Sequence, residues 1–196
     1  MRQGWKGRLS YQREENGTIR SLTIGADGLD ENEDLRIRKE WTEWDGFSVL
    51  TVKVEPLRAV KLENAYIERW IPEDQVDRVH MNGFQSWTES REWGHREVMH
   101  GLRRIFFPWI KKYYLDNYGD YSFTRYRPDR SLGYSWFYFR NADEILFLGS
   151  LSEQLGYTRF YWHRQRFLLR VERECEGLQL HETVPLLELL ITRGDE

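Results

Sequence analysis

The sequence has little cysteine, no long apolar run and no excess of charge of one sign, and each absence excludes a class of protein. The single cysteine, Cys175, cannot form an intrachain disulfide, and a zinc site built from several cysteines is excluded. No apolar segment approaches the roughly 20 residues of a membrane span. The segment from Met1 to Gly7 lacks the apolar centre of a secretory signal, so we expect a cytoplasmic protein.

The charge balance and the missing motifs exclude further functions. Lysine and arginine number 29 against 32 aspartates and glutamates, a formal net charge of -3. A nucleic-acid-binding domain normally has a basic excess, so nucleic acid is not an expected partner. The sequence contains no phosphate-binding glycine loop, no dinucleotide fingerprint and no His-Glu-x-x-His pair among its five histidines. It therefore predicts neither a metal site nor a cofactor.

Aromatic residues are abundant, at 15% of the chain, with 9 Trp, 11 Tyr and 10 Phe. Most should lie in a core, because aromatic side chains supply much of the buried area of a β-sandwich. Sugar rings also have apolar C–H faces that stack on Trp and Tyr. The composition is therefore compatible with a contact with carbohydrate.

Runs of β-branched, aromatic and apolar residues between turn signals predict one mainly-β domain over residues 1–196, an antiparallel β-sandwich. The expected strands include residues 47–54, 59–70, 78–81, 134–140, 145–151, 158–162, 167–171, 178–180 and 186–192. The acidic segment Asp27 to Asp34 predicts an exposed loop, and Asn141 to Glu144 predicts a hairpin loop.

One segment has helical spacing. Val98, Leu102 and Ile105 share one helical face with Trp109, but Pro108 lacks the N–H needed inside a helix. We therefore expect one or two short helices between about residues 95 and 116.

Few residues are candidates for catalysis. Cys175 lies among Glu172, Glu174 and Glu176, which should raise its thiol pKa and leave it inert. Glycoside hydrolysis needs two facing carboxylates, for which Glu89 and Asp120 are one possible pair. Any such pair is expected by chance among so many acids, so we expect no catalytic residue in this chain.

The most informative segment runs from His80 to Glu89 and contains Asn82-Gly83-Phe84-Gln85-Ser86-Trp87. In one interpretation it is a turn whose Phe84 and Trp87 fill the core. In the other it is a projecting loop, with Trp87 as a stacking platform for sugar and Asn82 and Gln85 as hydrogen-bonding groups. The residues alone favour the first interpretation.

The same segment resembles the Asn-x-aromatic-Gln-Ser-Trp motif in the N-terminal domain of family 36 glycoside hydrolases, the α-galactosidase or melibiase type. Three later segments resemble pieces of that domain in the same order: Gly119-Asp120-Tyr121, Leu148-Gly149-Ser150-Leu151-Ser152 and Pro185-Leu186-Leu187-Glu188-Leu189-Leu190. The segment from His95 to Lys112 departs from the compact members of the family.

The resemblance implies an N-terminal β-supersandwich, followed in the family by a retaining (β/α)8 barrel that carries two catalytic aspartates and by a C-terminal β-domain. Such a barrel takes at least about 200 residues, so this chain corresponds to the sandwich without the barrel. By the same resemblance, Trp87 is a sugar-stacking wall, and Asn82, Phe84, Gln85 and Ser86 shape its loop.

The implied function is therefore that of an accessory domain, non-catalytic by itself, whose partners are an α-galactoside and the catalytic barrel. A homo-oligomer is possible. Two other functions remain open at this point: a free-standing carbohydrate-binding module and a structural or oligomerisation domain.

Overall fold

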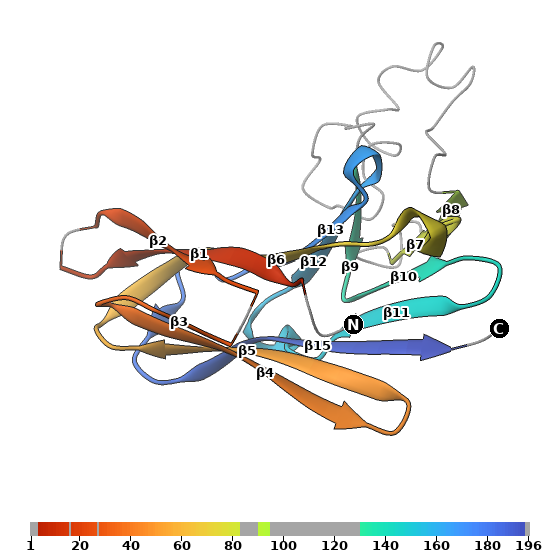
Figure 1. The fold of residues 1–196 in the computed structure, drawn as a ribbon. Helices are drawn as coiled ribbons and strands as arrows, with labels where there is room; N and C mark the ends of the chain where they lie inside the picture. Colours follow the sequence, from red (N-terminus) through yellow and green to blue (C-terminus); the bar gives the residue numbers. More distant parts are fainter. Residues whose placement is uncertain (1–3, 16, 27, 83–89, 95–129, 195–196) are drawn as a thin grey trace, which may run out of the picture.

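The computed structural model describes residues 4–194 apart from residues 16, 27, 83–89 and 95–129. Two antiparallel sheets pack face to face, which confirms the predicted β-sandwich (Figure 1). The helices expected between about residues 95 and 116 lie outside the described residues. Among the described residues, no helix is long and apolar enough to cross a membrane.

The first sheet, sheet A, has seven strands in the order β2-β1-β6-β13-β12-β9, with β14 beside β6. Their bounds are β1 Lys6–Arg13, β2 Ile19–Ile24, β6 Val60–Trp70, β9 Arg130–Tyr134, β12 Thr158–His163, β13 Leu168–Arg173 and β14 Gln179–Leu180.

The second sheet, sheet B, has eight strands in the order β3-β4-β5-β15-β11-β10-β7-β8. Their bounds are β3 Leu29–Glu31, β4 Leu35–Trp44, β5 Phe47–Pro56, β7 Arg78–Met81, β8 Arg91–Gly94, β10 Trp136–Arg140, β11 Ile145–Ser150 and β15 Val184–Gly194. In the described part of the chain, short 3₁₀ turns lie in the connections: η1 Glu73–Gln75, η3 Glu153–Leu155 and η4 Arg164–Arg166.

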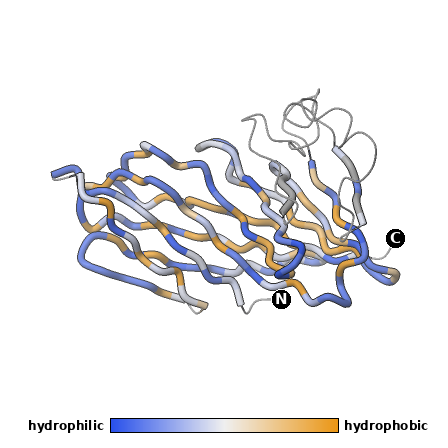
Figure 2. The backbone as a smooth tube through the Cα atoms, turned by 90° about the horizontal axis from the view of Figure 1, so that it is seen from above, coloured by the Kyte–Doolittle hydropathy of each residue, from blue (hydrophilic) through white to orange (hydrophobic). Residues whose placement is uncertain are grey.

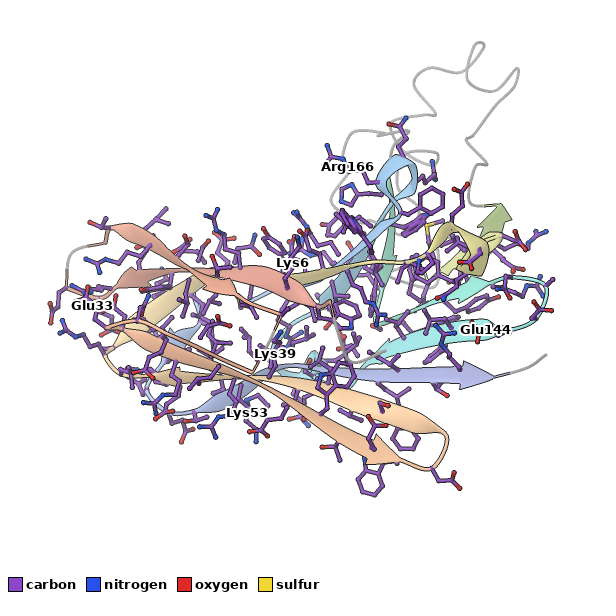
Figure 3. The ribbon with its side chains drawn as sticks, viewed as in Figure 1. Lys6, Glu33, Lys39, Lys53, Glu144 and Arg166 are labelled. Carbon is purple, nitrogen blue, oxygen red and sulfur yellow. The ribbon has the colours of Figure 1, made fainter. Side chains whose placement is uncertain are left out.

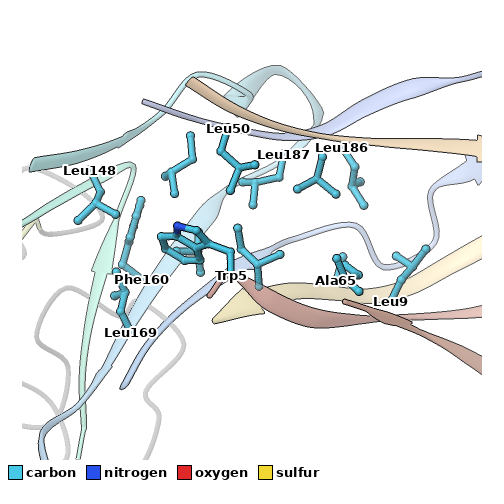
Figure 4. Packing of buried hydrophobic residues seen from close by; sticks show 14 of the residues in the cluster. Trp5, Leu9, Leu50, Ala65, Leu148, Phe160, Leu169, Leu186 and Leu187 are labelled. Carbon is cyan, nitrogen blue, oxygen red and sulfur yellow. The ribbon is translucent and has the colours of Figure 1, made fainter. Parts of the chain in front are cut away.

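A single hydrophobic core fills the space between the sheets. Hydrophobic and hydrophilic residues alternate along the strands, as Figure 2 shows, so each strand turns one set of side chains inward. Trp5, Phe160 and Leu169 on the sheet A side meet Leu50 and Leu187 of sheet B (Figure 4). Burying each side chain of this size contributes roughly 1.5–3 kcal/mol relative to leaving it in water.

Charged side chains lie mainly around this core. Glu33, Lys53 and Arg166 lie at the periphery of the molecule (Figure 3). Lys39 is an instructive case, because its ammonium group donates to the backbone oxygens of Trp5, Gly25 and Ala26. These bonds tie the start of the chain and the segment after β2 to β4.

The segment from Tyr134 to Arg140, predicted as one strand, is divided between the two sheets. Tyr134 ends β9 in sheet A and Trp136 begins β10 in sheet B. Ser135 between them has a positive φ of 61°, a left-handed conformation that bends the chain. Its N–H donates to Thr158 O (3.1 Å) and its carbonyl accepts from Ser150 N (2.7 Å).

The predicted exposed loop from Asp27 to Asp34 is wrong in two respects. Leu29–Glu31 forms the edge strand β3, and Asp34 is completely buried. The buried carboxylate accepts hydrogen bonds from Tyr11 Oη (2.8 Å) and Arg13 Nε (2.7 Å). A charged group is tolerated inside a protein when it is paired in this way, so an acidic residue in a polar segment need not be exposed.

Other local predictions are confirmed. Asn141 to Glu144 joins β10 to β11 as the expected hairpin loop, where Asn141 Oδ1 accepts from the backbone N–H groups of Asp143 and Glu144. The strands β1, β2 and β4 had no individual prediction. In β1 and β4 the outward positions carry several charged residues, which makes the alternation less evident than in β5.

Candidate functional site

The segment that carries the sugar-binding motif connects two neighbouring strands of sheet B. Strands β7 and β8 are antiparallel, with Met81 opposite Arg91 and His80 opposite Glu92. Residues 82–90 therefore form the connection of a β-hairpin at the edge of the sheet, since β8 is the last strand in the order. We call this element the β7–β8 hairpin.

Asn82 anchors the base of this hairpin. Its side-chain Nδ2 donates to the carbonyl oxygen of Tyr134 (3.1 Å), and its Oδ1 accepts from Ser90 Oγ (2.9 Å). The backbone adds a further bond, from Tyr134 N to Asn82 O (3.0 Å). Asn82, the first residue of the connection, is thus bonded to Ser90, its last residue, and to Tyr134 of β9 in the other sheet.

The other predicted sugar-binding residues, Phe84, Gln85, Ser86 and Trp87, lie outside the described residues. So do Glu89 and Asp120, the possible carboxylate pair. Of the motif, the structure thus describes only Asn82, which it places in an anchoring position.

A cluster of aromatic rings lies on the outer face of sheet B beside this hairpin. His80 of β7 stacks on Trp136 and Tyr138 of β10, with centroid distances of 4.5 and 4.8 Å and interplanar angles of 6° and 11°. Phe147 of β11 lies 6.0 Å from Trp136. All four side chains are partly exposed.

Sequence reasoning missed this cluster, although a signal was present. β10 has aromatic residues at four successive positions, from Trp136 to Phe139. Side chains of a strand alternate between its faces, so a run of this kind must place aromatic rings on both faces. Phe137 and Phe139 are completely buried in the core, which leaves Trp136 and Tyr138 on the outer face.

Charged groups lie next to the rings. The Glu92 carboxylate is 2.8 Å from Arg140 Nε and 3.4 Å from Arg78 Nε. Burial lowers the pKa of His80 below its ordinary value, against the opposing effect of Glu92. His80 is therefore neutral at physiological pH, and its buried Nε2 has no hydrogen-bond partner in the part of the chain that the structure describes.

Cys175 is unsuited to chemistry, as predicted, but the main reason differs. Burial raises the pKa of its thiol to about 12; Arg173 lowers this pKa, while Glu172 and Glu63 raise it further. Desolvation therefore has a larger effect than the acidic neighbours. Among the described residues, no group of three or more His, Cys, Asp or Glu side chains is arranged to hold a metal ion.

Comparison with known proteins adds no evidence for a function: no protein-family model matches the sequence, and no curated protein matches it. The function proposed for this chain consequently rests on its motif and on the geometry of the β7–β8 hairpin.

Proposed function

We propose that the chain is an accessory β-sandwich domain of an α-galactosidase-like glycoside hydrolase, which contributes to a sugar pocket but is not catalytic alone. The observation that carries the proposal is the position of the Asn82–Trp87 motif. It lies in the connection of a hairpin whose two ends are held together by the Ser90–Asn82 hydrogen bond.

A hairpin is a suitable way to present side chains to another domain. Paired strands hold both ends of the connection, and the bonds of Asn82 to Tyr134 add a second point of attachment. Fixing the ends of a binding segment reduces the conformational entropy that is lost when it binds. In this proposal Asn82 is the anchor of the hairpin, and the residues after it in the motif contact the sugar.

In this proposal Trp87 forms a wall against an α-galactoside, and Phe84, Gln85 and Ser86 shape the hairpin around it. The catalytic barrel of the same enzyme is the partner that completes the pocket, and the protein is cytoplasmic. The two-sheet architecture agrees with the supersandwich that the motif implies.

Complementation tests the proposal. A catalytic barrel of the α-galactosidase family is produced without its N-terminal sandwich, and this chain is added to it. We expect binding between the two and a gain of activity on an α-galactoside, with the gain lost in Trp87→Ala. Trp70→Ala is the control, because Trp70 lies at the end of β6 in the other sheet and is 72% exposed.

Two results of this experiment would contradict the proposal. One is the absence of both binding and activity with the unmodified chain. The other is an equal loss of the gain in Trp87→Ala and Trp70→Ala, which would show that the tryptophan of the motif has no special part in it.

A second function, that of a free-standing carbohydrate-binding module, is favoured by the aromatic cluster of His80, Trp136, Tyr138 and Phe147. It requires that the chain bind sugar without any barrel. If Trp87 supplies that site, the binding is lost in Trp87→Ala.

A further inference from the structure

The base of the β7–β8 hairpin is in close contact with the segment from Gly133 to Ser135, where the chain crosses from sheet A to sheet B. The backbone N–H of Tyr134 donates to Asn82 O (3.0 Å), and Asn82 Nδ2 donates to Tyr134 O (3.1 Å). Gly133 lies directly against the hairpin, since a Cβ atom added there would be 3.3 Å from Asn82 N and from Met81 Cα. The position of Asn82 therefore depends on this segment, which we call the crossing segment.

A single peptide group in the crossing segment makes the contact with Asn82 and a second contact on its other side. The carbonyl oxygen of Tyr134 accepts from Asn82. The N–H of Ser135, which belongs to the same peptide group, donates to Thr158 O (3.1 Å). Because a peptide group is rigid and planar, these two hydrogen bonds cannot be adjusted separately. A rotation that breaks the bond to Thr158 also moves the acceptor of Asn82.

Ser135, Thr158 and Ser150 are hydrogen-bonded to one another in a closed ring, which we call the polar triangle. Besides the bond from Ser135 to Thr158, the backbone N–H of Ser150 donates to Ser135 O (2.7 Å). The hydroxyl oxygens of Ser150 and Thr158 lie 2.7 Å apart and share a hydrogen bond. Thr158 is completely buried. A buried hydroxyl that loses its partner costs free energy, so each member of the triangle restrains the other two.

Arg173 fastens the loop that joins two members of the polar triangle. This loop connects Ser150 at the end of β11 to Thr158 at the start of β12. The guanidinium group of Arg173, a residue only 1% exposed, donates to the carbonyl oxygens of Ser152 and Gly156, near the two ends of the loop. Ser150 and Thr158 are thus kept together by their own hydroxyl groups and by Arg173.

We propose that Thr158 and Ser150 are positioning residues for the β7–β8 hairpin. Their hydroxyl groups fix the peptide group between Tyr134 and Ser135, and this peptide group fixes Asn82 at the base of the hairpin. The consequence for sugar binding rests on the function proposed above. The positioning of Asn82 itself can be measured in the chain alone.

Amide hydrogen exchange of the whole chain, followed by NMR, tests the positioning. Thr158→Val keeps the shape of the side chain but removes its hydroxyl. It should accelerate exchange of the Tyr134 amide, the donor to Asn82 O, about tenfold, because the base of the hairpin opens more often. Ser150→Ala should have a similar effect, and so should Gly133→Ala, whose methyl group would press on Asn82 N. Thr158→Ser keeps the hydroxyl and should retain the protection.

Thr51→Val is the matched control. Thr51 is also a buried threonine, but it lies on β5, three strands away from β10 in the order of sheet B. This variant should leave exchange of the Tyr134 amide unchanged. In every variant the rate is compared with that of the Ile67 amide in β6, inside sheet A, which separates a local opening from a general loss of stability.

Complementation of a catalytic barrel tests the consequence for the sugar. Thr158→Val should reduce the gain of activity about tenfold, because a small displacement of a contacting group has a large effect on rate. Thr158→Ser should restore the gain. Absence of complementation by the unmodified chain would contradict the proposed function, and the exchange experiment would still decide whether Thr158 positions Asn82.

Three results would overturn the inference. The first is an unchanged exchange rate of the Tyr134 amide in Thr158→Val. The second is an equal acceleration in Thr158→Val and in either Thr158→Ser or Thr51→Val, which would trace the effect to packing or to a general loss of stability. The third is an undiminished gain of activity in Thr158→Val although its Tyr134 amide exchanges faster.

Discussion

At the scale of single residues, the most consequential side chain is the buried Asp34. It is surrounded by Tyr11, Arg13 and Arg20, and Arg13 also pairs with the exposed Glu33. The backbone oxygen of Asp34 accepts from the N–H groups of Leu57 and Arg58 as well, so one residue joins four segments of the chain. Loss of the Asp34 charge leaves the Tyr11 hydroxyl without its carboxylate partner and leaves Arg13 and Arg20 paired with the exposed Glu33 alone.

Asp34→Asn should therefore lower the free energy of unfolding by roughly 1–3 kcal/mol, the usual cost of leaving buried hydrogen-bonding groups without their full partners. Urea unfolding at neutral pH measures this loss. Glu33→Gln is the matched control at the neighbouring, exposed position and should have little effect. Similar losses in both variants would show that the burial of Asp34 does not matter.

The same carboxyl group makes the stability of the protein depend on pH. Burial alone would raise the pKa of Asp34, but the hydrogen bonds from Arg13 and Tyr11 and the charges of Arg13 and Arg20 give a net lowering. A carboxyl group with a lowered folded-state pKa stabilises the protein above its unfolded pKa of about 3.9 and loses this effect as pH falls through the folded pKa. The difference in unfolding free energy between the unmodified chain and Asp34→Asn should therefore be constant near neutral pH and shrink only in strong acid.

Cys175 should be unreactive in the folded protein. With a thiol pKa of about 12 and a buried side chain, almost no thiolate is present at pH 8. A thiol reagent such as Ellman's reagent should therefore react only after denaturant is added, when the pKa returns to an ordinary value. Rapid reaction of the native protein would contradict the buried position of this residue.

At the scale of secondary-structure elements, Ser135 determines how the chain passes from sheet A to sheet B. Its left-handed backbone is uncommon for a residue other than glycine, and it is held by hydrogen bonds to Thr158 and Ser150 on opposite sides. The crossing places β9 and β10 in different sheets although only one residue separates them.

Substitution of Ser135 tests this crossing. Ser135→Val should destabilise the protein by roughly 1–3 kcal/mol, because a β-branched residue strongly disfavours a positive φ. Ser135→Gly should be neutral or slightly stabilising, since glycine adopts this conformation without steric cost. Thermal unfolding of the two variants beside the unmodified chain gives the order, and an equal effect of both would argue against a conformational cause.

At the scale of the whole molecule, both sheets contribute to one core, so the sandwich should unfold as a unit. Phe160 of β12 is completely buried and stacks with Phe137 of β10 across the two sheets (5.9 Å). Phe160→Ala should cost roughly 3–5 kcal/mol through lost burial and the cavity that remains.

Far-UV circular dichroism and tryptophan fluorescence should report the same shifted midpoint for this variant, because coincident transitions are the mark of cooperative unfolding. Tyr161→Ala, at the next position of β12 on the opposite face, is the comparison and should cost less. A shift seen by only one probe would show that the two sheets unfold separately.

The sequence alone predicted the sandwich and many of its strands, including the β10–β11 hairpin and the strand from Phe47 to Val54. It did so because alternation and turn residues are local signals that need no knowledge of distant contacts. The motif from Asn82 to Trp87 was recognisable for the same reason. The inertness of Cys175 was also predicted, from neighbours in sequence that turned out to be a lesser cause than burial.

Only the tertiary structure decided which strands pair and which polar groups are buried. Asp34 could be assigned to the interior only once Tyr11 and Arg13 were brought beside it, and Asn82 became an anchor only through Tyr134 of a distant strand. The cluster of aromatic rings on sheet B likewise depends on the register of strands far apart in the chain, as with Tyr138 opposite His80. Register is set by the packing of the two sheets against each other, which no local pattern contains.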